Sequence, residues 1–243
     1  MKIDILTLFP EMCEGFLGES IIGRARKDKK VEIACHNIRD YTLDKHNRVD
    51  DAPYGGGMGM VMAAQPINDC LEAVIKDYEK KPRVIYLSPK GKTFDQKKAI
   101  ELSKLDGFVL LCGHYEGVDE RVLEKCVDEE ISLGDFVLTG GEIAAVAVAD
   151  AVCRLLPGVL SDDICFSEES HWSGLLEYPQ YTRPSLWEGR EVPEILLSGH
   201  HANITKWRRE KSLETTLKKR PEMLENADLT DNDINYLKNL KQK

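Results

Sequence analysis

Short apolar runs alternate with amphipathic segments over the first two-thirds of the chain, and this alternation limits the folds open to it. Strand-like runs occupy residues 2–9, 31–38, 83–87 and 108–112. From Pro66 onward, apolar residues recur at the 3.6-residue spacing of a helix with one buried face, and residues 94–105 and 118–126 are also helix-like. The alternation predicts an α/β domain with a largely parallel sheet.

The last third of the chain has a different pattern. The run GEIAAVAVADAVCRLL at 141–156 is apolar nearly all the way round a helix, which favours burial on most sides, at a subunit contact. Polar, acidic residues without periodicity follow, and two or three helices extend from about Asn203 to Lys241. We therefore expect a domain at 1–158, a flexible linker at 159–171 and a mostly helical domain at 172–243.

Charge and cysteine content limit the partners and the compartment. The 243 residues carry a net charge of −9, yet residues 171–220 carry nine basic and six acidic side chains, a local excess that suits a polyanion. The seven cysteines are scattered without a C-x-x-C pair, which indicates reduced, mostly buried thiols and no metal site. No apolar run approaches the ~20 residues of a membrane span, and MKIDILTLFPEM does not resemble a signal peptide. We expect a cytoplasmic protein without a membrane partner.

Three glycine-containing segments follow strand-like runs, at 89–91, 113–117 and 134–141. Ligands of open α/β sheets gather at the carboxyl ends of strands, so these segments predict a pocket lined mainly by backbone. Such a pocket suits an uncharged or zwitterionic cofactor. Within ISLGDFVLTGGE at 131–142, the glycines are expected to bracket a short strand, and Gly-Gly-Glu to open a helix. His114 and Glu116 are either an acid–base pair or structural.

The segment YGGGMGM at 54–60 is a further candidate. It is not a P-loop, because no Gly-Lys-Ser/Thr follows, and Met62 stands where a dinucleotide fingerprint has its third glycine. It is either a flexible turn or a place where backbone closely approaches a ligand.

Several of these blocks together resemble one family. LSPKG at 87–91, LCGHYEGVDER at 111–121 and SLGDFVLTGGE at 132–142 closely resemble the bacterial tRNA (guanine-N1)-methyltransferases of the SPOUT class, which modify guanine 37. The similarity continues through DDAPYGGGMGMVM, LLPGVL, GLLEYPQYTRP and SGHHANITKWR, at 50–62, 155–160, 174–184 and 198–208. It implies a SPOUT-type sheet with a deep C-terminal trefoil knot and S-adenosylmethionine as cofactor. It also implies a homodimer with active sites shared between subunits, and a helical domain that grips tRNA.

The same resemblance assigns binding residues. The cofactor would lie against Leu87, Pro89, Gly113, Tyr115, Ser132, Leu133, Gly134, Asp135, Phe136, Val137, Leu138, Gly140 and Gly141. The target guanine would lie against Tyr54, Gly55, Gly57 and Gly59, and the rest of the tRNA against Tyr181, Arg183, His201, Lys206, Arg208 and Arg209. Trp207 either stacks on a base or faces the core.

The substrate chemistry requires two further groups. N1 of guanine carries a proton, so a carboxylate base is needed near N1 and a cation near O6. Arg154 matches the family's arginine, or is simply a cation at a helix C-terminus, and Glu116 matches a position near the methionine end or the target base. Glu169 stands where the family has aspartate followed by serine, with Glu168 and Asp163 as alternatives. Another RNA target, or a tRNA-binding protein without catalysis, are the rival hypotheses.

Overall fold

The chain forms two compact units, Met1–Ser161 and Asp162–Lys243, in the computed structural model. The structure describes residues 1–160 and 169–240. The predicted linker, 159–171, spans the boundary between the units, and residues 161–168 of it lie outside the described residues.

The N-terminal unit contains a five-stranded sheet in which all neighbouring strands are parallel. The four strand-like runs of the sequence all lie in it, so the predicted α/β class with a largely parallel sheet is confirmed. A short antiparallel ribbon of β3 (Asp50–Asp51) and β4 (Val61–Met62) lies outside this sheet. In spatial order the sheet consists of β2 (Glu32–Asn37), β1 (Lys2–Thr7), β6 (Gly107–Cys112), β5 (Arg83–Thr93) and β7 (Glu129–Ser132).

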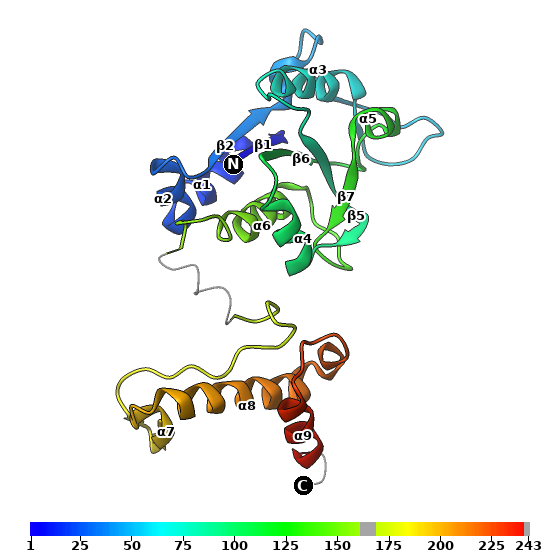
Figure 1. The fold of residues 1–243 in the computed structure, drawn as a ribbon. Coiled ribbons are helices and arrows are strands. Elements are labelled where there is room, and N and C mark those ends of the chain that lie inside the picture. Colours follow the sequence, from blue (N-terminus) through cyan, green and yellow to red (C-terminus); the bar gives the residue numbers. More distant parts are fainter. Residues whose placement is uncertain (161–168, 241–243) are drawn as a thin grey trace. The chain divides into compact units, whose positions relative to one another are not determined.

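Helices cover both faces of the sheet (Figure 1). One face is covered by α1 (Pro10–Leu17), α2 (Ser20–Lys27), α4 (Gln96–Leu102) and α6 (Glu142–Cys153). The other is covered by the 3-10 helix η1 (Ile38–Tyr41), α3 (Ala64–Ile75) and α5 (Glu120–Cys126).

Successive residues of the central strands enter opposite cores, as the two-residue period of a strand requires. In β6, Phe108 and Leu110 pack with α1 and α6, whereas Val109 and Leu111 pack with α3 and α5. Because both faces are covered, every residue of β6 is buried. This explains why the strands are continuous apolar runs rather than alternating ones.

The structure differs from the sequence prediction in several elements, among them α1, α2 and residues 133–139. The pattern does not predict α1 or α2, because Pro10 is interpreted there as the end of a strand, whereas it also occupies the first position of α1. The short strand expected between Gly134 and Gly140 is wrong, since the described residues 133–139 form bends and coil. The adjacent strand β7 already ends at Ser132, and its partner β5 ends at Thr93. The ladder between these two strands therefore stops before residues 133–139.

The C-terminal unit is mostly helical around a small core of Leu175, Leu213 and Leu237. Arg209 of its longest helix donates to Asp233, which is 5% exposed, at 2.9 Å from Nη2 to Oδ2. The Thr230 hydroxyl and amide also donate to this carboxylate, which caps the last helix. The elements are β8 (Leu186–Trp187), β9 (Arg190–Glu191), α7 (Glu194–Leu197), α8 (His201–Lys219), the 3-10 helix η3 (Pro221–Glu225) and α9 (Asp231–Leu240).

Two further sequence expectations concern thiols and membranes. The described cysteines are free thiols, and Cys13, Cys70, Cys112 and Cys153 are buried. Among the helices of the described residues, none has the length and apolar character that a membrane span requires.

We predict that the Asp233 carboxylate stabilises the C-terminal unit in a pH-dependent way. Burial acts to raise the pKa of Asp233, but hydrogen bonds from Arg209 and Thr230 outweigh it, so its pKa lies below the ordinary value. A group with a lowered pKa stabilises the fold above its ordinary pKa, about 4, and loses that effect as pH falls further. Asp233→Asn should therefore cost about 1–3 kcal/mol of unfolding free energy at pH 7.

Unfolding in urea, monitored through the amide hydrogen exchange of α9, measures this cost. The difference between Asp233→Asn and the unmodified chain should shrink below pH 4. Asp231→Asn is the matched control, because Asp231 begins the same helix but is exposed. Equal losses in the two variants would contradict the prediction.

Candidate functional site

A cavity of about 320 Å³ opens at the ends of β6 and β7, beside residues 86–90 of β5. Its walls come from three segments that are far apart in the sequence: 86–90, 113–118 and 131–141. Glu120 and Leu123 of α5 and Ala144 of α6 complete the lining. The location is the one at which open α/β sheets bind their ligands.

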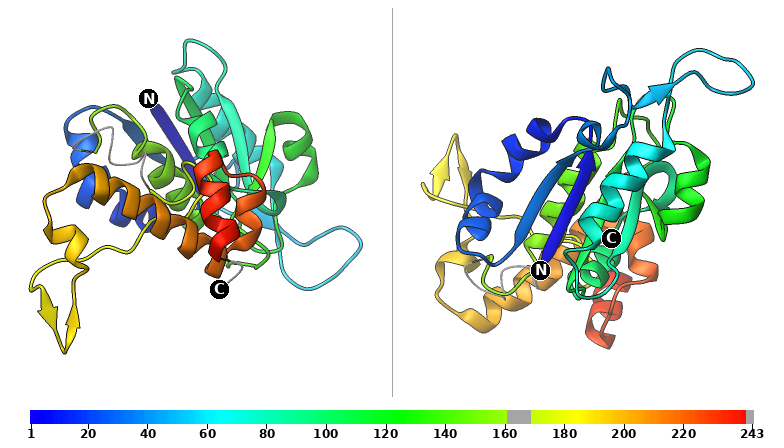
Figure 2. Two further views of the ribbon diagram at one scale, coloured as in Figure 1. Left: turned by 60° about the horizontal axis from the view of Figure 1, so that its bottom comes forward. Right: turned by 90° about the horizontal axis from the view of Figure 1, so that it is seen from above.

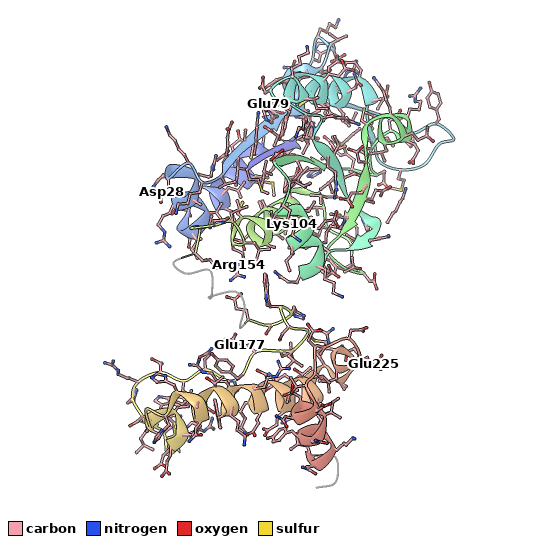
Figure 3. All side chains as sticks on the ribbon, viewed as in Figure 1. Asp28, Glu79, Lys104, Arg154, Glu177 and Glu225 are labelled. Carbon is pink, nitrogen blue, oxygen red and sulfur yellow. The ribbon has the colours of Figure 1, made fainter. Side chains whose placement is uncertain are left out.

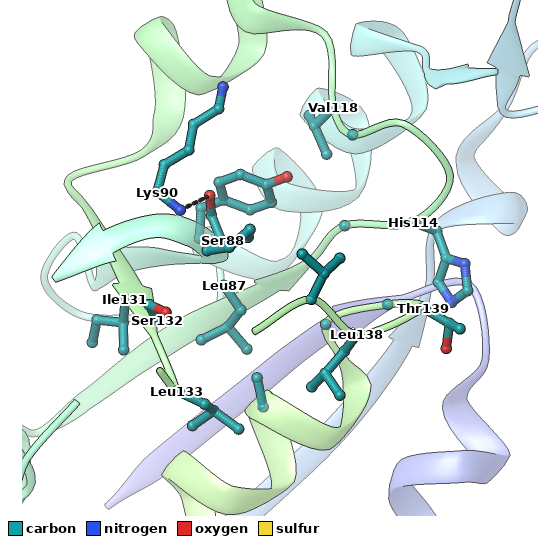
Figure 4. A pocket seen from close by; sticks show the side chains of 18 of the residues that line it. Leu87, Ser88, Lys90, His114, Val118, Ile131, Ser132, Leu133, Leu138 and Thr139 are labelled. Carbon is teal, nitrogen blue, oxygen red and sulfur yellow. Dashed lines mark hydrogen bonds between the residues drawn. The ribbon is translucent and has the colours of Figure 1, made fainter. Parts of the chain in front are cut away.

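Most residues predicted to bind a cofactor lie around this cavity. Of the thirteen, all but Gly134 and Asp135 line it. Gly134 instead closes a turn with Ser132, whose hydroxyl donates to the Gly134 carbonyl at 3.0 Å and accepts its N–H at 3.1 Å. Figure 4 shows the side chains of Leu87, Leu133 and Leu138 gathered on one side of the cavity.

Other lining residues were not among the predicted cofactor-binding residues, although Lys90, His114, Gly117 and Thr139 lie within the segments predicted to line a pocket. Several are direct neighbours of predicted ones, and their position in the same glycine-containing blocks is the signal that could have found them. Glu120 and Leu123 lie on one face of α5 and become lining residues only through packing. The neighbours are Tyr86, Ser88, Lys90, His114, Gly117, Val118, Ile131 and Thr139.

The first wall is a bulge inside β5 and not a loop after it. Leu87 and Lys92 both pair with Ile131, so residues 88–91 bulge out of the ladder. A Cβ on Gly91 would lie 2.4 Å from the Glu130 carbonyl carbon, so a side chain does not fit at this position. The glycine therefore permits the bulge to lie against β7.

The second and third walls are bonded to one another. The Gly141 N–H donates to the Gly113 carbonyl at 2.9 Å, and His114 and Gly140 form an isolated antiparallel bridge. A Cβ on Gly141 would lie 2.7 Å from the Cys112 Cα. The Gly-Gly pair at the start of α6 therefore permits the close approach on which the cavity depends.

The glycine-rich loop at 54–60 joins the cavity through Glu116. The Glu116 N–H donates to the Met60 carbonyl at 2.9 Å, and the Met62 N–H donates to Gly117 at 2.9 Å. A Cβ on Gly59 would lie 2.5 Å from the Glu116 Cγ. The structure thus brings the YGGGMGM and HYEG motifs together, a contact that neither motif indicates alone.

The rest of the glycine-rich loop projects from the N-terminal unit (Figure 2). Tyr54 at its start is fully exposed, and Met58 near its end is 91% exposed. Gly55 and Gly57 have positive φ angles of 87° and 128°, a conformation that favours glycine. The loop therefore offers an exposed surface beside the cavity.

The electrostatics of the cavity follow from burial and from nearby carboxylates. Burial, together with the nearby charges of Glu130 and Glu120, raises the pKa of Tyr86 to about 12. The Tyr86 hydroxyl is therefore a neutral hydrogen-bond donor at physiological pH. Glu116 and Glu120 make one part of the lining acidic, and Lys90 adds a cation.

The three predicted catalytic residues are divided between the two units of the chain. Glu116 lines the cavity, whereas Arg154 caps the C-terminus of α6 (Figure 3). Ala144 is the α6 residue of the lining nearest to Arg154 in the sequence, and the ten residues from Ala144 to Arg154 correspond to about 15 Å of helix. Glu169, in the C-terminal unit, lines a separate cavity of about 210 Å³ with Tyr178, Arg208 and other residues. The alternative bases Glu168 and Asp163 lie outside the described residues.

The predicted RNA-binding residues of the C-terminal unit have different surroundings. Arg183 and His201 are exposed, Tyr181 is 48% exposed and Lys206 is 77% exposed. The guanidinium of Arg208 lies over the Tyr178 ring at 4.8 Å. Arg209 pairs with the buried Asp233, and half-buried Trp207 lies 6.4 Å from the Tyr181 ring. In the part of the chain that the structure describes, no cluster of three or more His, Cys, Asp or Glu side chains could hold a metal ion.

Comparison with known proteins gives a consistent result. A family model described as tRNA (Guanine-1)-methyltransferase TrmD matches residues 1–226. A relative named tRNA (guanine-N(1)-)-methyltransferase from Clostridium beijerinckii is 60% identical over 243 residues, all of both chains. A protein of the same name from Ruminiclostridium cellulolyticum is 59% identical, over 92% of this chain and 96% of its own. Another, from Alkaliphilus oremlandii, is 55% identical over all of both chains.

The contact between Gly59 and Glu116 gives a prediction with a matched control. Gly55 and Gly59 share a φ of 87°, so alanine adds similar backbone strain of about 1–2 kcal/mol at either position. Only at Gly59 does the new Cβ meet Glu116, since Gly55 has nothing within 4 Å. Gly59→Ala should therefore displace the loop at 113–117, and Gly55→Ala should not.

Amide hydrogen exchange measures the displacement. We expect faster exchange at Glu116 and Met62 in Gly59→Ala, because the Glu116 N–H donates to Met60 and the Met62 N–H donates to Gly117, and these two bonds hold the loops together. Unchanged exchange in that variant would show that Glu116 can move aside without loosening the loop.

Proposed function

Because the chain belongs to the tRNA (guanine-1)-methyltransferase family, we propose that it transfers a methyl group from S-adenosylmethionine to N1 of guanine 37 in the anticodon loop of tRNA. The observation that carries the proposal is the cavity at the carboxyl ends of β6 and β7, beside residues 86–90 of β5, with Glu116 bonded to the exposed glycine-rich loop. The cavity is a candidate for the cofactor, and the loop for the target base.

The lining of the cavity fits S-adenosylmethionine in its chemistry. Apolar side chains such as Leu87, Leu133 and Leu138 would hold the flat adenine, and backbone groups near Gly113 and Gly140 would bond its polar edge. Glu116 and Glu120 would favour the positive charges of the sulfonium and the amino group. When bound, this cofactor supplies a methyl group activated by its positively charged sulfur.

We also propose that residues around the cavity form the deep trefoil knot of the SPOUT class. The Phe94 N–H donates to Ser132 at 2.7 Å, and Gly141 donates to Gly113 at 2.9 Å. The segment between these bonds is therefore held against both β5 and the loop after β6. This arrangement supports a threaded chain.

In the proposed reaction, residues of this chain remove the proton from N1 of guanine and stabilise the negative charge that develops on O6. Removing the N1 proton frees a lone pair for the methyl group and moves negative charge onto O6. We propose that Glu169 takes the proton, that Arg154 stabilises the charge at O6, and that Glu116 orients the reacting groups.

The position of Arg154 supports a homodimer with shared active sites. About 15 Å of helix lies between the cavity lining and Arg154 of the same chain, so we infer that Arg154 acts at the cavity of a second copy. Exposed apolar side chains offer a surface for that copy, on α1 at Met12 and Phe16 and on α6 at Ile143. Mixing Arg154→Ala chains with Glu169→Gln chains should restore some activity if these roles come from opposite subunits.

The tRNA itself would be held by the C-terminal unit, in the cytoplasm. Arg183, His201 and Lys206 are exposed cations or donors there, and Tyr181 is an exposed aromatic ring. Phosphates and unstacked bases of an RNA loop are the partners that such side chains bind.

Methylation of tRNA transcripts tests the whole proposal. Transcripts with guanine at position 37 should be methylated, and the same transcripts with adenine at 37 should not. Methylation of both would indicate another RNA target, and binding without methylation would indicate a tRNA-binding protein without catalysis.

Arg154→Ala should abolish turnover with little effect on cofactor binding. Negative charge at O6 develops mainly in the transition state, so the loss falls on kcat, by about 100-fold or more. Single-turnover methylation and calorimetric titration with S-adenosylmethionine separate the two effects. Near-normal single-turnover rates would overturn this role of Arg154.

Glu169→Gln should cost far more activity than Glu168→Gln, because glutamine keeps the shape of the side chain and loses its basicity. We expect a loss of about 100-fold or more, as for removal of a general base. Glu169→Asp should keep substantial activity, since aspartate keeps the carboxylate and is the residue that the family resemblance implies at this position. A larger loss in Glu168→Gln would show that Glu168, and not Glu169, is the base. The pH–rate profile of that variant would confirm the new assignment.

A further inference from the structure

A buried carboxylate at the start of α6 connects two parts of the N-terminal unit. Glu142 is the first residue of α6 and is 2% exposed. The Thr7 hydroxyl, at the end of β1, donates to its Oε1 at 2.6 Å. Nε2 of His114, in the loop after β6, lies 3.3 Å from its Oε2. One carboxylate therefore joins β1, α6 and the loop that lines the cavity.

The carboxylate and the His114 ring both lie close to the backbone of Gly140. A Cβ on Gly140 would lie 2.3 Å from His114 Nε2 and 2.4 Å from Glu142 Oε2. The His114 ring packs against Phe9, with centroids 4.8 Å apart, and the Phe9 N–H donates to the Thr7 hydroxyl at 2.9 Å. The network runs without a break from Phe9 to His114.

The energetic cost of burial makes the network cooperative. A buried carboxylate is costly unless hydrogen bonds and nearby positive potential compensate for it. Here the compensation comes from Thr7, from His114 and from the N-terminal end of α6. Loss of the Thr7 hydrogen bond to Glu142 therefore also weakens the interaction between Glu142 and His114.

We propose that Glu142 is a positioning residue, which holds the loop at 113–117 through His114 in the conformation that receives the cofactor. This inference rests on the proposed function. The residues next to His114 are Gly113, Tyr115 and Glu116, all of which line the cavity. If the network is weakened, a smaller fraction of molecules has the competent loop, so apparent cofactor affinity falls by that fraction. Saturating cofactor restores the loop, so kcat changes little.

Thr7→Val in the full chain tests this inference. Thr7 is fully buried, and valine has nearly the same shape without the hydroxyl. Calorimetric titration should show an increase of about tenfold in the Kd for S-adenosylmethionine, as for loss of one hydrogen bond to a charged group. The kcat at saturating cofactor should stay within about twofold, and Thr7→Ser should restore most of the affinity.

Tyr78→Phe is the matched control. The Tyr78 hydroxyl also donates to a buried carboxylate on β1, that of Asp4, at 2.6 Å. Tyr78 lies at the opposite end of the sheet, beside the starts of β5 and β6. Tyr78→Phe should lower thermal stability to a similar extent and leave the Kd for S-adenosylmethionine unchanged.

The outcomes separate this inference from the proposed function. If Thr7→Val lowers stability as the control does without changing the Kd, the network is merely structural and the inference is overturned. If Thr7→Val does not fold, Glu142→Gln takes its place, because Glu142 does not line the cavity, and it has the same expected increase in Kd and the same overturning result. An unmodified chain that neither binds S-adenosylmethionine nor methylates tRNA would overturn the proposed function, and this inference with it.

Discussion

The close approach of Gly141 to Cys112 and Gly113 is the constraint on which the cavity depends. The Gly141 N–H donates to the Gly113 carbonyl at 2.9 Å, and no side chain fits at Gly141. The bond fixes where α6 begins, and so places Glu142 in reach of Thr7 and His114. It also holds the third wall against the second. A parallel sheet places the carboxyl ends of its strands at one edge. The bond between Gly141 and Gly113 holds two of the segments that follow these ends together, and so encloses the cavity there.

The same helix, α6, separates two groups that the proposed reaction needs, the cavity and Arg154. The ten residues from Ala144, in the cavity lining, to Arg154 make a rigid spacer of about 15 Å. Glu169 belongs to the other unit of the chain. The cofactor site, the cation and the base thus come from three places, so a proposed active site needs an assembly larger than the N-terminal unit. A second copy of the chain would bury the apolar residues exposed on α1 and α6 and bring a second Arg154.

The sheet could be predicted from the sequence because buried parallel strands are continuous apolar runs, as β1 and β6 are. α1 and α2 could not, since each has only eight residues and Pro10 suits a strand end as well as a helix start. Most cavity residues followed from the family resemblance, and their roles stay predictions. The contact of Gly59 with Glu116 and the network of Glu142 depend on how distant segments pack. No local pattern carries that information.

The basic excess of residues 171–220 is partly used within the C-terminal unit. Arg209 pairs with the buried Asp233 and also donates to the Asp228 carbonyl, so it holds α9 to α8. Lys206 pairs with Glu210 only at 3.9 Å and is 77% exposed; such surface pairs are worth about 0–1 kcal/mol and exchange readily with a phosphate. Arg183, Arg190, Lys218 and Lys219 are exposed and have no carboxylate partner among the described residues. These four residues and Lys206 are therefore better placed to bind a polyanion than Arg209 is, because the charge of Arg209 already pairs with Asp233.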